Sequence, residues 1–188
     1  MQTKKTNALK TRDMVYIAMF AALMAACAWI TVPMPEVPFT MQVFGVFLAL
    51  CVLGGEKGTL SILVYILLGA VGAPVFSNFK GGPGVLLGVT GGYILGFLAS
   101  GLVYWLVTAL LPKRSLAVTV LGLCLGLAAC YAFGTGWFML VYLKKSGPIG
   151  LGYVLMKCVV PYILPDLCKM GLAVSVSAVI RKRIRISG

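Results

Sequence analysis

Long apolar runs separated by short polar breaks make up most of this sequence. A bilayer core about 30 Å thick needs roughly 20 apolar residues per helix, and most of the runs approach or exceed that length, the run at 41–53 being shorter. The breaks are rich in Pro, Gly and Lys, which is typical of positions where helices end. The pattern predicts six transmembrane helices, at about 14–32, 41–53, 59–75, 85–111, 116–143 and 165–180.

Two prolines, Pro161 and Pro165, interrupt the last apolar region. In a helix interior each would lack a backbone N–H and clash with the preceding turn. We therefore expect a short segment on the outer side of the membrane, followed by a sixth helix that begins at about Pro165. The predicted fold class is an all-α integral membrane protein, with residues 1–188 forming one six-helix domain.

The composition excludes an ordinary soluble domain. Hydrophobic residues make up 61% of the chain and charged residues only 11%, with a mean hydropathy of +1.03. The net charge of +12 is compatible with nucleic-acid binding, but the basic residues cluster at the chain ends and in the breaks and form no basic face interleaved with aromatic residues. We interpret this charge as a signal of membrane topology.

The basic residues predict which side of the membrane each break occupies. Six crossings place both termini on one side, and cytoplasmic loops carry the excess of Lys and Arg. That side would hold eleven of these residues, against three on the other. The eleven are Lys4, Lys5, Lys10, Arg12, Lys57, Lys113, Arg114, Arg181, Lys182, Arg183 and Arg185, and the three are Lys80, Lys144 and Lys145. Both termini are predicted to be cytoplasmic, with an N-terminal segment at 1–13 and a basic tail at 181–188, in a prokaryotic plasma membrane.

Catalytic and metal-binding motifs are missing from the sequence. It contains no histidine, and none of its six cysteines forms a C-x-x-C pair, which argues against a zinc site. No segment matches the phosphate-binding loop of ATPases. We therefore expect no catalytic residue, no metal site and no cofactor, and we expect any energy from ATP to come from a partner.

A few ionisable residues lie inside the apolar runs: Lys157, Asp166 and Lys169. Charges at this depth are costly and usually face a cavity or a partner. Asp166 and Lys169 are three residues apart, so they share one face of a helix. They form either a structural ion pair or part of a binding site. Asp166 lies 15 residues before Arg181, or about 22 Å of helix, which puts it in the outer half of the membrane.

Other polar or small residues are expected at the same outer level. They are Thr40 and Gln42 before the second predicted helix, Asn78 in the second outer loop, and Gly91, Gly92 and Tyr93 early in the fourth helix. Each is unspecific alone, but polar groups that converge on an apolar cavity suit a small solute with hydrogen-bonding ends. The sequence thus predicts an outward-facing pocket.

A stripe of small residues on the first helix is a candidate docking surface. Ala18, Ala22 and Ala26 recur every four residues, and such stripes let helices approach closely in lipid. The alternative is packing against other helices of this chain. Gly88, Gly92 and Gly96 have the same spacing and are assigned to internal packing.

Four segments together resemble a known family: VPFTMQ at 37–42, GAVGAPVF at 69–76, GGYILGF at 91–97 and PDLCK at 165–169. They are similar to BioY, the biotin-specific substrate-binding subunit (S component) of energy-coupling factor (ECF) transporters. The resemblance covers essentially the whole chain. It implies six membrane helices, high-affinity biotin binding near the outer face, and docking of the alanine stripe on a transmembrane coupling subunit that works with two ATPases.

The chemistry of biotin fits the candidate residues. We expect Asp166 and Asn78 to accept hydrogen bonds from the two ureido N–H groups, and Lys169 to donate to the ureido carbonyl or the carboxylate tail. Two alternatives remain: the same architecture with another small vitamin as its ligand, and a stand-alone secondary transporter. The latter usually shows internal repeats with matched broken helices, and we find none between residues 1–94 and 95–188.

Overall fold

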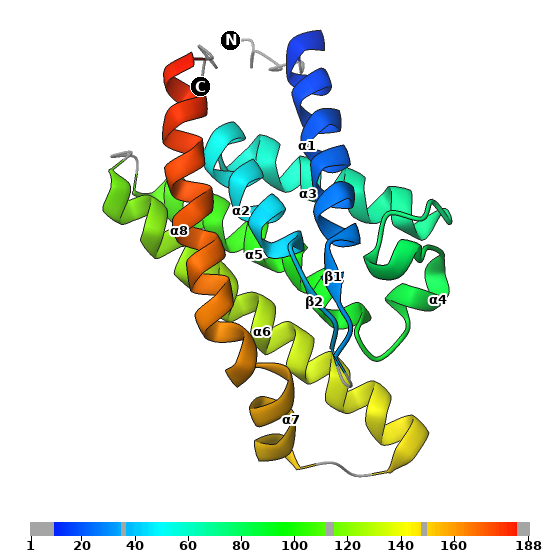
Figure 1. Ribbon diagram of the computed structural model, residues 1–188. Coiled ribbons are helices and arrows are strands. Elements are labelled where there is room, and N and C mark those ends of the chain that lie inside the picture. Colours follow the sequence, from blue (N-terminus) through cyan, green and yellow to red (C-terminus); the bar gives the residue numbers. More distant parts are fainter. Residues whose placement is uncertain (1–9, 35–36, 112–114, 148–149, 184–188) are drawn as a thin grey trace, which may run out of the picture.

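The structure is almost entirely helical (Figure 1). It is a computed structural model that describes residues 10–34, 37–111, 115–147 and 150–183. Besides a 3-10 turn, η1, at Ser77–Phe79, the helices are α1 (Thr11–Trp29), α2 (Gln42–Leu53), α3 (Gly55–Ala70), α4 (Pro83–Leu86), α5 (Gly91–Leu110), α6 (Leu116–Ser146), α7 (Leu151–Cys158) and α8 (Val160–Arg183). The predicted all-α class is confirmed.

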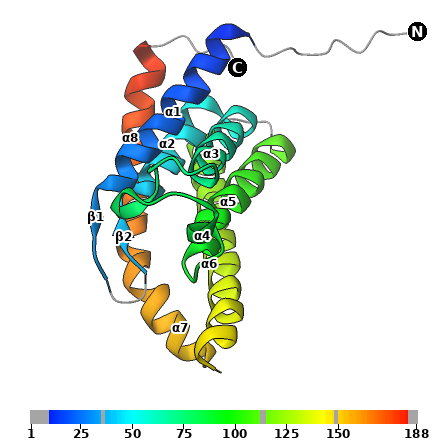
Figure 2. The ribbon, with the colours of Figure 1, turned by 90° about the vertical axis from the view of Figure 1, so that its right-hand side faces the viewer.

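Within the described residues, four helical segments are long and apolar enough to cross a membrane. They are α1, α5, α6 and the joined α7–α8 segment. Helix α2 has 12 residues and α3 has 16, or about 18 and 24 Å, so both are shorter than the bilayer core. Figures 1 and 2 show the start of α1 and the end of α8 at the same end of the molecule, as an even number of crossings requires. The count of six spans stays a prediction.

Three predicted boundaries were wrong. The expected helix at 59–75 is observed as α3, which begins at Gly55 and ends at Ala70. It begins earlier than predicted because a single residue, Gly54, with φ +85°, separates it from α2. The expected helix at 85–111 is divided into the short α4 and the long α5. Helix α8 begins at Val160 and contains Pro165. Pro161 lies in its first turn, where the missing N–H costs no helical hydrogen bond. Pro165 lies inside the helix and removes one i→i−4 bond, and α8 continues through it.

One small sheet interrupts the helices. The segment between α1 and α2 pairs β1 (Thr31–Val32) with β2 (Phe39–Thr40), antiparallel, with Thr31 opposite Thr40. Prolines at 33, 35 and 38 lie between the two strands, and because proline cannot donate to a strand ladder the pairing stays short. We call the described parts of this segment, residues 30–34 and 37–41, the β1–β2 hairpin.

Part of the charge argument lies outside the described residues. Lys4, Lys5, Lys113, Arg114 and Arg185 belong to segments that the structure does not describe, as do most of the N-terminal segment at 1–13 and of the tail at 181–188. The cytoplasmic placement of both termini therefore stays a prediction.

Glycines allow α5 and α6 to pack closely. A Cβ atom at Gly92 would lie 2.2 Å from the Cβ of Trp137, and one at Gly96 would lie 2.9 Å from the carbonyl oxygen of Cys130. Small residues of this kind permit close contact between membrane helices. The internal-packing role predicted for Gly92 and Gly96 is confirmed, and the contact brings Tyr93 of α5 against α6.

Candidate functional site

A pocket lies between the β1–β2 hairpin, the first turns of α2, α5 and α8, the middle of α6 and the end of α7. Most of its wall is apolar, with a few polar side chains directed into it, as is usual for sites that bind small molecules. The lining residues are Val37, Pro38, Thr40, Gln42, Val43, Ser77, Thr90, Tyr93, Ile94, Phe97, Leu127, Cys130, Tyr131, Cys158, Tyr162, Asp166 and Lys169.

A buried ion pair forms the charged part of the pocket. The Lys169 Nζ atom lies 2.8 Å from Oδ1 of Asp166, one helical turn before it, and the two residues are only 6% and 3% exposed. The other carboxylate oxygen, Oδ2, accepts a hydrogen bond of 2.7 Å from the hydroxyl of Tyr131. Burying charges is costly unless they are paired and hydrogen-bonded, and both oxygens of this carboxylate have a partner.

Lys169 also joins α8 to the β1–β2 hairpin. Its ammonium group donates to the backbone carbonyl of Thr40 at 2.7 Å and lies 3.8 Å from the centre of the Phe39 ring, a cation–π geometry. Together with Asp166, these contacts give the ammonium group two hydrogen-bond acceptors and one aromatic face. The hairpin is therefore fixed to the charged centre of the pocket.

A chain of neutral hydrogen bonds extends from the hairpin into the core. The hydroxyl of Thr40 donates to Oε1 of Gln42 at 3.0 Å, and the Gln42 amide donates to the hydroxyl of Tyr65. Tyr65 in turn donates to the carbonyl of Val75 at 3.1 Å. Because buried polar groups need partners, this chain fixes the orientation of Gln42 at the pocket wall.

Two more tyrosines complete the wall. Tyr162 donates its hydroxyl to the carbonyl of Val37 and stacks on Phe39, with ring centroids 6.3 Å apart. Tyr93 lies 3.4 Å, hydroxyl to hydroxyl, from Thr135. The pocket thus offers a carboxylate that accepts hydrogen bonds, an ammonium group and aromatic surfaces, a combination that suits a small solute with both N–H donors and apolar parts.

The structure brings together five of the eight residues predicted to bind the solute: Thr40, Gln42, Tyr93, Asp166 and Lys169. The other three lie outside the lining. Asn78 is exposed, with left-handed backbone angles in η1, while its neighbour Ser77 lines the pocket. Gly91 and Gly92 lie against Leu86 and Trp137. Solute binding by all eight residues stays a prediction.

Two tyrosines of the pocket were not predicted from the sequence: Tyr131, which bonds to Asp166, and Tyr162, which bonds to the carbonyl of Val37. Tyr131 lies in the middle of the long apolar α6, and its polar tip within that run was the available signal. Tyr162 lies between Pro161 and Pro165, in the short outer segment expected before the sixth helix. The formation of α8 through both prolines is what turns Tyr162 toward the hairpin.

The alanine stripe lies on the exposed side of α1. Ala18, Ala22 and Ala26 are exposed, whereas Ala21 and Ala25, one residue before the latter two, are buried in the core. The stripe is therefore not covered by the described part of this chain, and docking of a partner on it stays a prediction.

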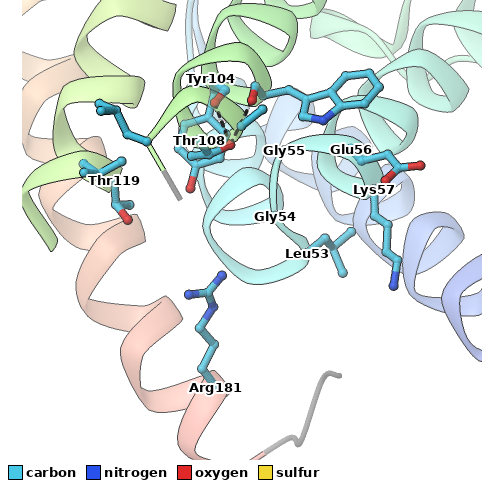
Figure 3. Close-up of a pocket in the computed structure, with 13 residues that line it drawn as sticks. Leu53, Gly54, Gly55, Glu56, Lys57, Tyr104, Thr108, Thr119 and Arg181 are labelled. Carbon is cyan, nitrogen blue, oxygen red and sulfur yellow. Dashed lines mark hydrogen bonds between the residues drawn. The ribbon is translucent and has the colours of Figure 1, made fainter. Parts of the chain in front are cut away.

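A second hollow lies near the end of the molecule where α8 ends (Figure 3). It is formed where α2 meets α3, by the end of α5, the start of α6 and Arg181. In Figure 3 the Arg181 side chain approaches the Gly54 turn from one side, with Glu56 and Lys57 on the other. Lys57 pairs with Asp13 of α1 at 3.0 Å.

Comparisons with known proteins identify the family. A sequence model of the BioY family matches residues 1–186. The Biotin transporter BioY of Thermotoga maritima is 39% identical over 91% of this chain and 96% of its own. The Probable biotin transporter BioY of Pyrococcus horikoshii is 36% identical over 90% and 96%.

A solved structure has the same fold. The crystal structure at 2.1 Å of the S-component for biotin from an ECF-type ABC transporter superposes with a TM-score of 0.79 and covers 93% of this chain and 95% of its own. At 22% identity this match supports the fold alone. The family follows from the sequence matches, which extend over nearly the whole length of both chains. This chain belongs to the BioY family.

Proposed function

We propose that this chain is the biotin-binding S component of an ECF-type importer and that it binds biotin in the pocket between the β1–β2 hairpin and α8. The observation that carries the proposal is the buried Asp166–Lys169 pair, which opens into a pocket lined by aromatic residues in a chain whose relatives are named biotin transporters.

The two ends of biotin differ in chemistry, and so do the groups of the pocket. The ureido ring presents two N–H donors, and Asp166 retains acceptor capacity beyond its bonds to Tyr131 and Lys169, since each carboxylate oxygen can accept twice. The apolar bicycle of biotin suits the Tyr93 and Phe97 side of the wall. We propose that the ureido ring lies toward Asp166 on α8.

Binding of radiolabelled biotin to the purified chain in detergent tests the proposal. We expect saturable binding that unlabelled biotin displaces and that other water-soluble vitamins do not. Displacement by a different vitamin at lower concentration would assign the pocket to that vitamin. Absence of biotin binding by a folded, monodisperse sample would refute the proposal.

We also propose the topology and partners that complete an importer. The chain would cross a prokaryotic plasma membrane six times, with both termini cytoplasmic, and would assemble with a transmembrane coupling subunit and two ATPase subunits. The exposed alanines of α1 support a docking surface there, because their small side chains leave room for the close approach of a partner helix.

Bulky substitutions on α1 test this docking surface. Trp at both Ala18 and Ala22 should leave biotin binding in detergent within about twofold, since these side chains point away from the core, while uptake by cells that express the complete transporter should be lost. Ala128 and Ala132 give a matched control, because they are also exposed and four residues apart, on α6. Normal uptake by the α1 double variant would show that the stripe faces only lipid.

A further inference from the structure

Helices α6 and α8 face each other across the pocket, and a side-chain hydrogen bond connects them. The Tyr131 hydroxyl on α6 donates to Oδ2 of Asp166 on α8 at 2.7 Å. A bond from a neutral hydroxyl to an ionised carboxylate is short and roughly twice as strong as a neutral one. Tyr131 therefore contacts the charged group of the pocket from the wall opposite to it.

Tyr131 differs from the other tyrosines of the pocket in its partner. Tyr162 donates to a backbone carbonyl of the hairpin, and Tyr93 lies against the hydroxyl of Thr135, contacts that hold the walls together. Tyr131 instead bonds the side chain with the largest hydrogen-bonding capacity toward a solute. Loss of the Tyr131 hydroxyl would therefore alter the hydrogen bonding of the Asp166 carboxylate more than the packing of the pocket wall.

The carboxylate has a second donor on its other oxygen. Lys169 holds Oδ1 at 2.8 Å from the same helix face, so Asp166 is fixed by one donor per oxygen, from two different helices. With only Lys169 left, the carboxylate would be free to rotate about its terminal torsion, which is broad and roughly two-fold. A fixed plane also fixes the directions of the lone pairs that remain for a solute.

We infer that Tyr131 is a positioning residue for solute recognition: by holding Oδ2, it orients the free lone pairs of Asp166 toward a ureido N–H group. This inference rests on the proposed biotin-binding function. The Tyr131 hydroxyl donates a hydrogen bond to Asp166, so toward the solute it retains only acceptor capacity. On this inference, its contribution to affinity acts through Asp166 and not through a direct bond to the solute.

A double-mutant cycle on biotin binding separates positioning from general support of the fold. Tyr131→Phe keeps the ring and removes only the hydroxyl, and we expect biotin affinity to fall about 10-fold or more, in the range of a lost hydrogen bond to a charged group. In the background of Asp166→Asn the same change should cost less than about threefold, because the oriented charge is already gone. Coupling of this size is the signature of two groups that act together.

Two variants at tyrosines serve as controls. Tyr142→Phe, also on α6, alters a ring that stacks on Phe138 outside the pocket and should leave affinity unchanged. Tyr131→4-aminophenylalanine keeps an N–H donor and should restore most of the affinity that Tyr131→Phe loses. This variant also provides the measurement if Tyr131→Phe fails to fold.

The outcomes distinguish this inference from the proposed function. No biotin binding by the wild-type chain would overturn the proposed function and the role of Tyr131 with it. Biotin binding that Tyr131→Phe leaves unchanged would overturn only the role of Tyr131. Equal losses in the wild-type and Asp166→Asn backgrounds would also overturn it, because Tyr131 would then support the wall and not the carboxylate.

Discussion

Charged side chains in the pocket near the hairpin and in the hollow near the end of α8 differ in their burial and bonding. In the pocket near the hairpin, Asp166 and Lys169 are almost fully buried and bonded to each other, to Tyr131 and to the backbone of Thr40. In the hollow near the end of α8, Arg181 and Glu56 are exposed, and Lys57 is half-buried in a pair with Asp13 of α1. Each hollow contains charged groups of both signs, so the presence of charge does not distinguish them.

The difference lies in what each arrangement costs to maintain. Exposed charges near a membrane surface keep their hydration, and surface ion pairs contribute about 0–1 kcal/mol. A buried pair forgoes that hydration and is weak evidence for stability on its own. Stability alone therefore does not account for this pair, and we propose that it serves solute recognition.

The largest expected effect comes from breaking the buried pair. Lys169→Met would leave the Asp166 carboxylate buried without its cation, and removing one partner of such a pair costs about 3–5 kcal/mol. We expect a clear fall in the unfolding temperature of the purified protein in detergent, together with loss of biotin binding, measured by a thermal-shift assay and by binding of radiolabelled biotin.

The double variant Lys169→Met with Asp166→Leu is the control for that experiment. It removes both charges, so it should recover much of the stability while biotin binding stays absent. If the double variant bound biotin normally, the pair would be structural, and the comparison between the two hollows would lose its functional meaning.

Asp166→Asn should have the next largest effect. The amide keeps the size of the side chain but removes the charge, and we expect biotin affinity to fall by about 1–3 kcal/mol, the range for a hydrogen bond to a charged group. Titration calorimetry on the folded variant measures this loss. Unchanged affinity would move Asp166 to the role of a structural partner for Lys169.

The smallest effect is expected in the other hollow. Arg181 is exposed on the last turns of α8, and substitutions at such surface positions usually change stability by less than about 0.5 kcal/mol. Arg181→Gln should leave the unfolding temperature and the biotin affinity within experimental error. A loss of affinity comparable to that of Asp166→Asn would show that the hollow near the end of α8 also contributes to biotin binding.

The sequence predicted the helical segments better than their limits. Helices α1, α2 and α6 begin and end within about three residues of the predicted runs, because hydropathy marks the residues that must avoid water. The division of the run at 85–111 into α4 and α5 was not predicted, since α4 and the following turn are themselves apolar. Hydropathy carries no signal for a break between two apolar segments.

The candidate site was predicted in the same uneven way. Asp166 and Lys169 stand out in an apolar chain, so their importance was visible from the cost of burying charge. Tyr131 and Tyr162 were missed because the chain has eight tyrosines, and nothing in the local sequence tells which of them faces a carboxylate. Asn78 was assigned to the site from its place in a loop, and the structure has it exposed beside Ser77.

By itself, the sequence determined that this chain is a helical membrane protein of the BioY type with two unusual charges in its last helix. Composition, periodicity and motif order can be read directly along the chain. Only the tertiary structure decided which residues meet. The hydrogen bond from Tyr131 to Asp166 joins residues 35 apart, and the bond from Lys169 to Thr40 joins residues 129 apart. Contacts of that range depend on how α6, α8 and the hairpin pack together, and no local pattern in the chain specifies that packing.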